Sequence, residues 1–433
     1  MVHVRKSNRK VSGSRARSST PMHSKSMIKQ AVGPTAHSKR QRQKQEHFKR
    51  ERRRVAFATQ RVRRERWASI ARDTQRIVLG DGNGSSSSLP FDGLAPIQHH
   101  PQGPPTVPVQ IVHDISPQVV LSKQGTTFYP HCSPALADWR RLEAINVRPL
   151  STKISFASTS TLTAARRLHK DNPGLSTDPS RSLPTTSIGA LSFASPKRPG
   201  GGFLHGGNEQ EEVFARSSSL LASLQNDPAK EFYKTHRKFL SLDGAGIHDH
   251  SMVYSPGVVV FRKDDDDDTP TGHTSTHPDA SSSDFITPYI VNVLSAVPVN
   301  AAAIRQNYLI TPSDAHVFED GIRDKMRDRM ARALRIFEVR GDRALILGAF
   351  GCGSSENRVE MVAELWAELL VCEERDIGKE GTGPDAPVKT RRAKFRDVFQ
   401  EVVFAVPGKL YEPFRKAFEM RLFESVLSNA ASE

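Results

Sequence analysis

The sequence predicts an α/β fold, in which helices flank a β-sheet. Three observations support this prediction. From about residue 107 onward, short apolar runs alternate with helical patterns, which is the order of elements in α/β domains. Two of the predicted strands run into glycine-rich loops that precede a helix. The 433 residues are also enough to bury a sizeable core.

The N-terminal region is strongly basic. Residues 1–66 contain 21 of the 62 Lys and Arg residues but only 3 of the 47 acidic residues, which leaves 41 basic and 44 acidic residues in 67–433. The net charge of +15 therefore belongs to a tail, and the body is close to neutral. Residues 1–45 are too poor in apolar side chains to form a core, so we expect them to be disordered.

The remaining elements follow in chain order. One helix is predicted over Gln43–Val78, which lacks Gly and Pro, and the turn-forming residues 80–106 are expected to form a loop or linker. Residues 263–284 contain five consecutive aspartates and are expected to form a solvated loop between two strands. The predicted strands are Gln110–His113, Ile154–Phe156, Ala190–Ala194, Val258–Phe261, Ile290–Val297, Ala344–Leu347 and Val402–Val406.

Three further helices are predicted from apolar residues that recur three or four positions apart. Their stripes are Ile322, Met326, Met330, Leu334 and Phe337; Val362, Leu365, Trp366 and Leu369; and Phe414, Phe418, Leu422 and Val426. Stripes of this kind usually face a neighbouring element. We therefore expect all three to pack in the core and not to contact a cofactor.

Cysteine usage and hydropathy exclude several classes of protein. Cys132, Cys352 and Cys372 have no C-x-x-C spacing, so they cannot build a disulfide framework or a zinc site alone, which favours a reducing compartment. No apolar run approaches the roughly 18–20 residues of a membrane span, and no apolar secretory segment follows the N-terminus. No membrane association is expected.

The segment Ala190–Glu212 is the most unusual part of the sequence. A predicted buried strand ends in the glycines Gly200–Gly202, which allow the backbone to approach a ligand closely. A predicted helix over residues 213–224 begins near Glu211 and Glu212, so its N-terminal N–H groups can bind an anion. Alternatively, the segment is a glycine-rich turn before an acidic helix start. His205, within this loop, is expected to face solvent.

A second glycine cluster, Gly348–Asn357, follows the predicted strand Ala344–Leu347 and precedes a helix from about Val359. A strand, a glycine-rich loop and a helix N-terminus form a geometry that holds diphosphates. Neither glycine loop matches the P-loop or the Rossmann motif. Two such loops at strand ends predict a nucleotide diphosphate bound across the sheet crevice. Cys352 lies among these glycines without a His/Asp arrangement and is expected to be a small packing residue.

The triple glycine Gly200–Gly202, seven residues, and Gln210-Glu211-Glu212 together resemble the GGG-x(6–8)-QEE motif of poly(ADP-ribose) glycohydrolases. The resemblance covers roughly residues 61–410. Segments resembling the microbial-type branch of this family in the same order are Arg64–Val78, Thr161–Leu168, Tyr254–Arg262, Ala296–Asn300, Leu347–Gly353 and Val403–Val406. The expected regions are a disordered basic tail (1–60), a helical extension with a linker (61–150) and a macrodomain-like catalytic domain (151–433).

The resemblance implies a macrodomain-like mixed sheet and hydrolysis of the ribose–ribose O-glycosidic bonds of poly(ADP-ribose), with neither metal nor cofactor. It implies that Glu212 is the catalytic acid/base, that Glu211 orients the substrate and that Gly348–Gly353 holds the diphosphate. Adjacent side chains on a helix do not share a face, so one glutamate must serve as both acid and base. The implied substrate-binding residues are Ser192, Gly200, Gly201, Gly202, Gln210, Asn300, Gly348, Ala349, Phe350, Gly351, Cys352, Gly353, Ser354 and Ser355.

Three positions depart from the pattern of the family. Ser192 stands where Asn is usual, Ser355 stands where a Phe that packs on the terminal ribose is common, and Glu356 stands where Gly is usual. Glu356 would repel a diphosphate if its side chain pointed inward. The alternative function is therefore a catalytically weakened macrodomain that binds ADP-ribose or poly(ADP-ribose) without turnover.

The basic run from Lys39 to Arg54 resembles a nuclear import signal, and it could also hold nucleic acid or poly(ADP-ribose) electrostatically. The expected partners are poly(ADP-ribose) or ADP-ribosylated proteins and, through the tail, an import receptor or nucleic acid. A nuclear location is favoured over a cytoplasmic one. A mitochondrial presequence competes because residues 1–45 are rich in Arg and Ser without acidic residues, although they lack a good apolar face.

Overall fold

The computed structural model describes residues 36–80, 88–91, 111–137, 139–140, 151–176, 185–241, 246–264, 284–376 and 389–430. The predictions of a disordered tail over 1–35 and of an aspartate-rich loop over 265–283 lie outside these residues. The chain divides into two units, Met1–Thr59 and Gln60–Glu433. The large sheet and the candidate site belong to the second unit.

Helix α1 (Ala36–Leu79) confirms the helix predicted over Gln43–Val78 and begins earlier. Its C-terminal part, within the second unit, buries Trp67, Ala71, Thr74 and Val78, which recur every three or four residues on one face. The Thr74 hydroxyl donates a hydrogen bond of 2.6 Å to the carbonyl oxygen of Arg216. This buried face fastens the end of α1 to the α/β core.

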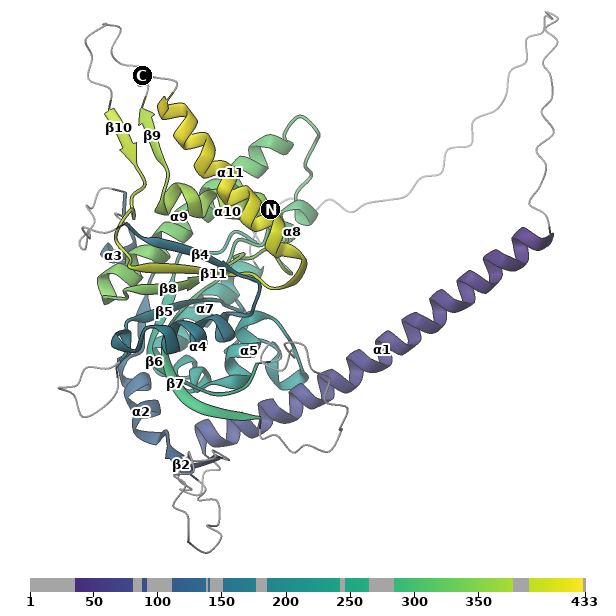
Figure 1. Cartoon of the computed structure of the whole chain (residues 1–433), viewed down its shortest axis with the longest axis horizontal. Helices are drawn as coiled ribbons and strands as arrows, with labels where there is room; N and C mark the ends of the chain where they lie inside the picture. Colours follow the sequence, from purple (N-terminus) through teal and green to yellow (C-terminus); the bar gives the residue numbers. More distant parts are fainter. Residues whose placement is uncertain are drawn as a thin grey trace, which may run out of the picture. The chain divides into compact units, whose positions relative to one another are not determined.

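A mixed seven-stranded sheet forms the centre of the second unit, in the order β3-β6-β7-β5-β8-β11-β4 (Figure 1). The strands are β3 (Thr127–Tyr129), β4 (Lys153–Ala157), β5 (Ile188–Phe193), β6 (Met252–Arg262), β7 (Phe285–Ala296), β8 (Ala344–Leu347) and β11 (Glu401–Ala405). Strand β6 runs antiparallel to β3 and β7, whereas β7, β5, β8, β11 and β4 are parallel. The central strands β5, β8 and β11 are buried almost throughout, because helices cover both faces of the sheet.

Helices pack on both faces of this sheet around two hydrophobic clusters. The helices of the first cluster are α3 (Pro134–Ala137), α8 (Ala301–Asn307), α9 (Ala315–Arg340), α10 (Val359–Leu370) and α11 (Tyr411–Ala430). The helices of the second cluster are α4 (Thr161–Asp171), α5 (Gln210–Ser217), α6 (Leu220–Leu224) and α7 (Asp227–Ser241). Helix α2 (Ser116–Gly125) packs beside β6 and α6. The predicted α/β class is confirmed.

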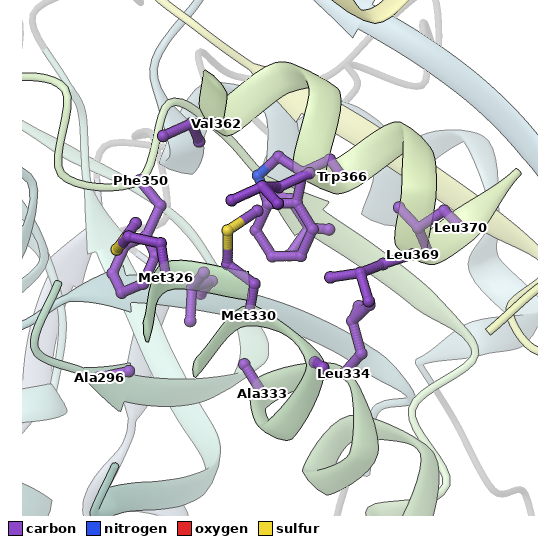
Figure 2. Close-up of a cluster of buried hydrophobic side chains, with 14 of the residues drawn as sticks. Ala296, Met326, Met330, Ala333, Leu334, Phe350, Val362, Trp366, Leu369 and Leu370 are labelled. Carbon is purple, nitrogen blue, oxygen red and sulfur yellow. The ribbon is translucent and has the colours of Figure 1, made fainter. Parts of the chain in front are cut away.

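The stripes predicted on α9 and α10 are buried in the core. Figure 2 shows Met330 of α9 beside Trp366 of α10 and Met326 beside Phe350, and all four side chains are fully buried. On α11, Phe414 and Phe418 are buried, but the predicted Val426 is 55% exposed, and Ser425 is buried in its place. Steps of four residues drift about 40° each around a helix, so Val426 points about 120° away from Phe414.

Several local elements differ from the sequence-based expectations. The helix predicted over 213–224 is interrupted at Ser218, which bridges to Val260 of β6 and separates α5 from α6. Strand β2 (Ile111–Asp114) does not join the large sheet but pairs with β1 (Ser88–Phe91), a strand inside the predicted linker 80–106. The remaining elements are β9 (Glu373–Asp376), β10 (Lys389–Arg392), η1 (Pro173–Leu175), η2 (Phe203–His205) and η4 (Gly408–Leu410).

The large sheet uses residues from both predicted regions after residue 61, since β3 pairs with β6 at its edge. Residues 36–60, which were expected to belong to the tail, lie in α1. Across the part of the chain that the structure describes, no helix is long and apolar enough to cross a membrane.

Candidate active site

The loop after β5 turns sharply on glycines before it enters α5. Gly200, Gly201 and Gly206 have positive φ angles of 68°, 54° and 70°, which side chains rarely adopt. A Cβ atom at Gly200 would also lie 2.9 Å from the Phe203 ring and 3.0 Å from the Cβ of Ala215. The loop is therefore folded tightly against the first turn of α5.

These glycines surround the carboxylate of Glu212. Its Oε1 accepts the Gly202 N–H at 2.6 Å, and its Oε2 accepts the Glu209 N–H at 2.8 Å. The second contact completes a capping box, in which the Glu209 side chain also accepts the N–H of Glu212. A Cβ at Gly207 would lie 2.2 Å from Glu212 Oε2. The glycines thus make room for a protein carboxylate.

Glu211, the preceding residue, faces inward and is only 1% exposed. Its carboxylate accepts the N–H groups of Ser195 at 2.5 Å and Gly200 at 3.2 Å, and the Tyr233 hydroxyl at 3.0 Å. Burial raises the pKa of Glu211 to about 7, against the effect of these three donors. Glu211 therefore connects Ser195 and Gly200, in the loop after β5, to Tyr233 of α7.

Gln210 ties the start of α5 to the sheet. Its amide nitrogen donates to the Thr161 hydroxyl at 2.8 Å and to the Leu191 carbonyl at 3.0 Å, and its amide oxygen accepts the Phe193 N–H at 2.6 Å. These bonds connect α5, α4 and the end of β5. The side chain positions the helix that carries Glu211 and Glu212.

A cavity of about 490 Å³ opens in front of the two glutamates, beyond the carboxyl ends of β5 and β7. Both glutamates line it, together with the cationic side chains of Lys197 and Arg198. Glu212 is half-buried and held at two oxygens, so its carboxylate presents a fixed orientation to this space. The remaining lining residues include Gly201, Gly202, Asn300, Gly351, Gly353, Ser354 and Ser355.

The second glycine loop, after β8, forms another wall of this cavity. Gly351 has a φ of 73°, and the Asn357 amide holds the loop by donating to the carbonyl oxygens of Gly351 and Val299. A Cβ at Gly348 would lie 2.6 Å from the Ala405 carbonyl oxygen, so this glycine permits close packing on β11. Two loops from separate strands thus meet across one crevice, as the sequence predicted.

A second cavity of about 300 Å³ adjoins the first, at the ends of β5, β8 and β11. Its walls are more apolar and include Leu162, Phe214 and Val406. Ala349 and Gln210 line this cavity and not the larger one. The crevice thus offers a polar compartment with the glutamates beside a more apolar compartment.

Five of the predicted substrate-binding residues line neither cavity: Ser192, Gly200, Gly348, Phe350 and Cys352. Phe350 is fully buried in the core. Burial raises the pKa of the Cys352 thiol to about 12, which suits the expected packing residue and not a nucleophile. Both predicted loops contribute residues to the cavities, but their side chains alternate between the crevice and the core.

The three departures from the family pattern have different surroundings. Ser192 is buried, and its hydroxyl has no hydrogen-bond partner among the residues that the structure describes. Ser355 lines the larger cavity. Glu356 has a φ of 51°, which explains why glycine suits this position, and its exposed side chain lines neither cavity. The Glu356 carboxylate therefore does not point into either cavity, as it would have to do to repel a diphosphate there.

Glu209 and His248 are site residues that the sequence-based reasoning missed. Glu209 lines both cavities, and its residue type provided little signal, because glutamate is not among the residues usually found at the N-cap of a capping box. His248 lines the larger cavity with a φ of 54°, and burial lowers its pKa to about 3. The buried Arg329 holds this backbone by donating to the carbonyl oxygens of Ile247 and His248. His205 is exposed, as predicted.

Among the described residues, no three His, Cys, Asp or Glu side chains come together as metal ligands would. The three cysteines are free thiols.

The chain is similar to known proteins in sequence and in fold. Residues 102–263 match the model "Microbial-type PARG, catalytic domain". No curated protein matches the chain in sequence. The poly(ADP-ribose) glycohydrolase (PARG) of Thermomonospora curvata has a similar crystal structure, with 28% identity and a TM-score of 0.56 over 82% of this chain and 99% of that one.

Two liganded structures are also similar. The Thermomonospora curvata PARG bound to the inhibitor ADP-HPD has 27% identity and a TM-score of 0.53, over 82% of this chain and 99% of that chain. The Deinococcus radiodurans PARG in complex with ADP-ribose has 26% identity and a TM-score of 0.50, over 71% of this chain and 97% of that chain.

Fold and site together define a mixed α/β protein with a PARG-like fold. The predicted resemblance to the microbial-type PARG family is confirmed, by the family model over residues 102–263 and by the fold over most of the chain. At family level, the chain therefore groups with glycoside hydrolases that act on ADP-ribose polymers.

Proposed function

We propose that this protein is a poly(ADP-ribose) glycohydrolase that cleaves ribose–ribose O-glycosidic bonds and releases ADP-ribose from the polymer end, with Glu212 as the single acid/base. The carboxylate of Glu212 carries this proposal. It lies at the wall of a 490 Å³ cavity, and the N–H groups of Gly202 and Glu209 fix its two oxygens. ADP-ribose, present in the Deinococcus radiodurans complex, supports the proposed ligand class.

The proposed reaction uses Glu212 twice. The protonated carboxyl group gives its proton to the leaving ribosyl oxygen as the glycosidic bond breaks, and the resulting carboxylate then takes a proton from the water that attacks the anomeric carbon. Glu211 cannot be the partner carboxylate across the bond, because its oxygens are turned inward to Ser195, Gly200 and Tyr233. Its role is to hold the loop that positions Glu212 and the substrate.

The decisive experiment measures ADP-ribose release from poly(ADP-ribose) by the wild type and by Glu212→Gln. The amide keeps an oxygen for one backbone N–H but cannot transfer the proton, so release should fall by about 10²–10⁴-fold. Equal release by both proteins would remove Glu212 from the chemistry. ADP-ribose binding by calorimetry on the same variant separates lost chemistry from a lost site.

A binding module without turnover is the second candidate function. The buried Ser192 hydroxyl favours this candidate. It has no hydrogen-bond partner within the described part of the chain and lines neither cavity, so this position supplies no polar group to a ligand. This candidate predicts that the wild type binds ADP-ribose but releases none from the polymer. Measured release above that of Glu212→Gln would exclude it.

We also propose that the basic part of α1 binds polyanions, including poly(ADP-ribose). Residues 44–66 are exposed throughout and contain ten Lys and Arg residues against three glutamates. Binding by the wild type should weaken steeply with salt, and replacement of Arg52, Arg53 and Arg54 by Gln should reduce the salt slope. Loss of nuclear accumulation in a fluorescent fusion of the same variant would support a nuclear import role.

A further inference from the structure

The two cavities of the crevice share three lining residues, Phe193, Glu209 and Gly353. We call this shared region the waist. One compartment contains Glu211 and Glu212, whereas the other is more apolar. A ligand with two ring systems joined by a diphosphate can occupy both compartments only if the diphosphate crosses the waist.

Glu209 projects its carboxylate into this waist. Its Oε2 lies 3.6 Å from the position that a Cβ of Gly353 would take, and the Ser354 hydroxyl donates a hydrogen bond to the same carboxylate. The capping box fixes Glu209 from the other side, through the N–H of Glu212. The carboxylate therefore connects the loop after β5 with the glycine loop after β8.

We infer that Glu209 is a specificity-determining residue that opposes a bridging diphosphate at the waist when its carboxylate is ionised. The inference rests on the proposed function, because it assumes a ligand that spans both compartments. A negatively charged diphosphate against Gly353 and Ser354 would lie beside the Glu209 carboxylate, and like charges at this separation repel each other. Protonation of the Glu209 carboxylate removes this repulsion.

Other charged groups around the waist act on the same equilibrium. Partial burial of Glu209 and, to a smaller extent, the charge of Glu212 raise its pKa. Glu211, Lys197, Arg198 and His248 line the larger cavity, and Arg63 and Asp264 line the smaller one. Affinity for an anionic ligand should therefore rise as the pH falls. The part of this pH dependence that is due to Glu209 should be absent in Glu209→Gln.

The test is calorimetric binding of ADP-ribose to the full chain as wild type, Glu209→Gln and Ser354→Ala. The glutamine keeps an oxygen for the capping box and for Ser354 but removes the charge. We expect Glu209→Gln to bind ADP-ribose about three- to tenfold more tightly at pH 8 and to have a flatter pH profile between pH 5 and 8. Ser354→Ala keeps the charge and should change affinity less than Glu209→Gln does.

Adenosine, which lacks a diphosphate, is the matched ligand control. Its affinity should be the same for the wild type and Glu209→Gln. Equal ADP-ribose affinities of these two proteins, or an equal gain for adenosine, would overturn the inference. ADP-ribose release from the polymer is measured separately. If the wild type releases ADP-ribose but Glu209→Gln binds ADP-ribose with the wild-type affinity, the inference about Glu209 is rejected and the proposed function is not. If ADP-ribose binds neither protein, both the inference about Glu209 and the proposed ligand are rejected.

Discussion

Glu211 and Glu212 are consecutive residues whose carboxylates point to different places. Glu211 is buried and accepts N–H groups from both ends of the glycine loop, at Ser195 and Gly200. Glu212 is half-buried in the cavity wall and accepts the N–H groups of Gly202 and Glu209. One glutamate therefore shapes the loop, and the other faces the crevice.

Gly207→Ala should strongly reduce ADP-ribose release while the protein stays folded. Its Cβ would lie 2.2 Å from Glu212 Oε2, so the carboxylate must leave its position between the backbone N–H groups. ADP-ribose release should fall at least about tenfold, because small displacements of a catalytic group cost large factors in rate. Gly174→Ala is the control, since a Cβ there meets no atom within 4 Å and release should not change. Normal release by Gly207→Ala would contradict the prediction.

Glu211→Ala should destabilise the protein strongly. The substitution leaves the N–H groups of Ser195 and Gly200 and the Tyr233 hydroxyl without their acceptor. We expect the free energy of unfolding to fall by about 2–4 kcal/mol in urea denaturation. Tyr233→Phe removes a single donor and should cost about 1 kcal/mol. The prediction is wrong if both variants lose the same small amount.

The contribution of Glu211 and Asp342 to stability should decrease as the pH rises from about 5 to 8, whereas His236 and His248, whose pKa values burial lowers to about 4 and 3, contribute in the opposite direction. Burial raises the pKa of both Glu211 and Asp342 to about 7, so the folded state keeps protons that the unfolded state releases. The protonated Glu211 and Asp342 carboxyl groups therefore contribute to the free energy of unfolding at low pH, and this contribution is lost as the pH rises through 7. Asp342→Asn should lack this contribution, so the melting temperature of the wild type should fall relative to that of the variant as the pH rises. An unchanged slope in this variant would exclude Asp342 as a source.

Glu356→Gly should leave ADP-ribose affinity unchanged. The side chain is exposed and lines neither cavity, although the residue lies in the presumed diphosphate loop. Because its φ of 51° suits glycine, we expect a stability gain of under about 1 kcal/mol, measured by urea denaturation. A marked rise in affinity would show that this charge, and not that of Glu209, acts on the ligand.

Local pattern was sufficient for the α/β class, for the buried stripe of α9 and for the two glycine loops. Each depends on neighbours in the sequence: helical periodicity, strand-length apolar runs and glycines at strand ends. The break between α5 and α6 was not predictable in this way, since it depends on Ser218 bridging to Val260 of β6, 42 positions later in the chain.

The sequence by itself determined the resemblance to the microbial-type PARG family, because the spacing of Gly200–Gly202 and Gln210–Glu212 is local and specific. Only the tertiary structure decided which groups face the crevice. Phe350 belongs to a motif loop but packs in the core, whereas Glu209 and His248 line the larger cavity. The physical reason is that the direction in which a side chain points depends on packing between elements that are distant in the sequence. Glu209 and Gly353, for example, are 144 residues apart and together line the waist.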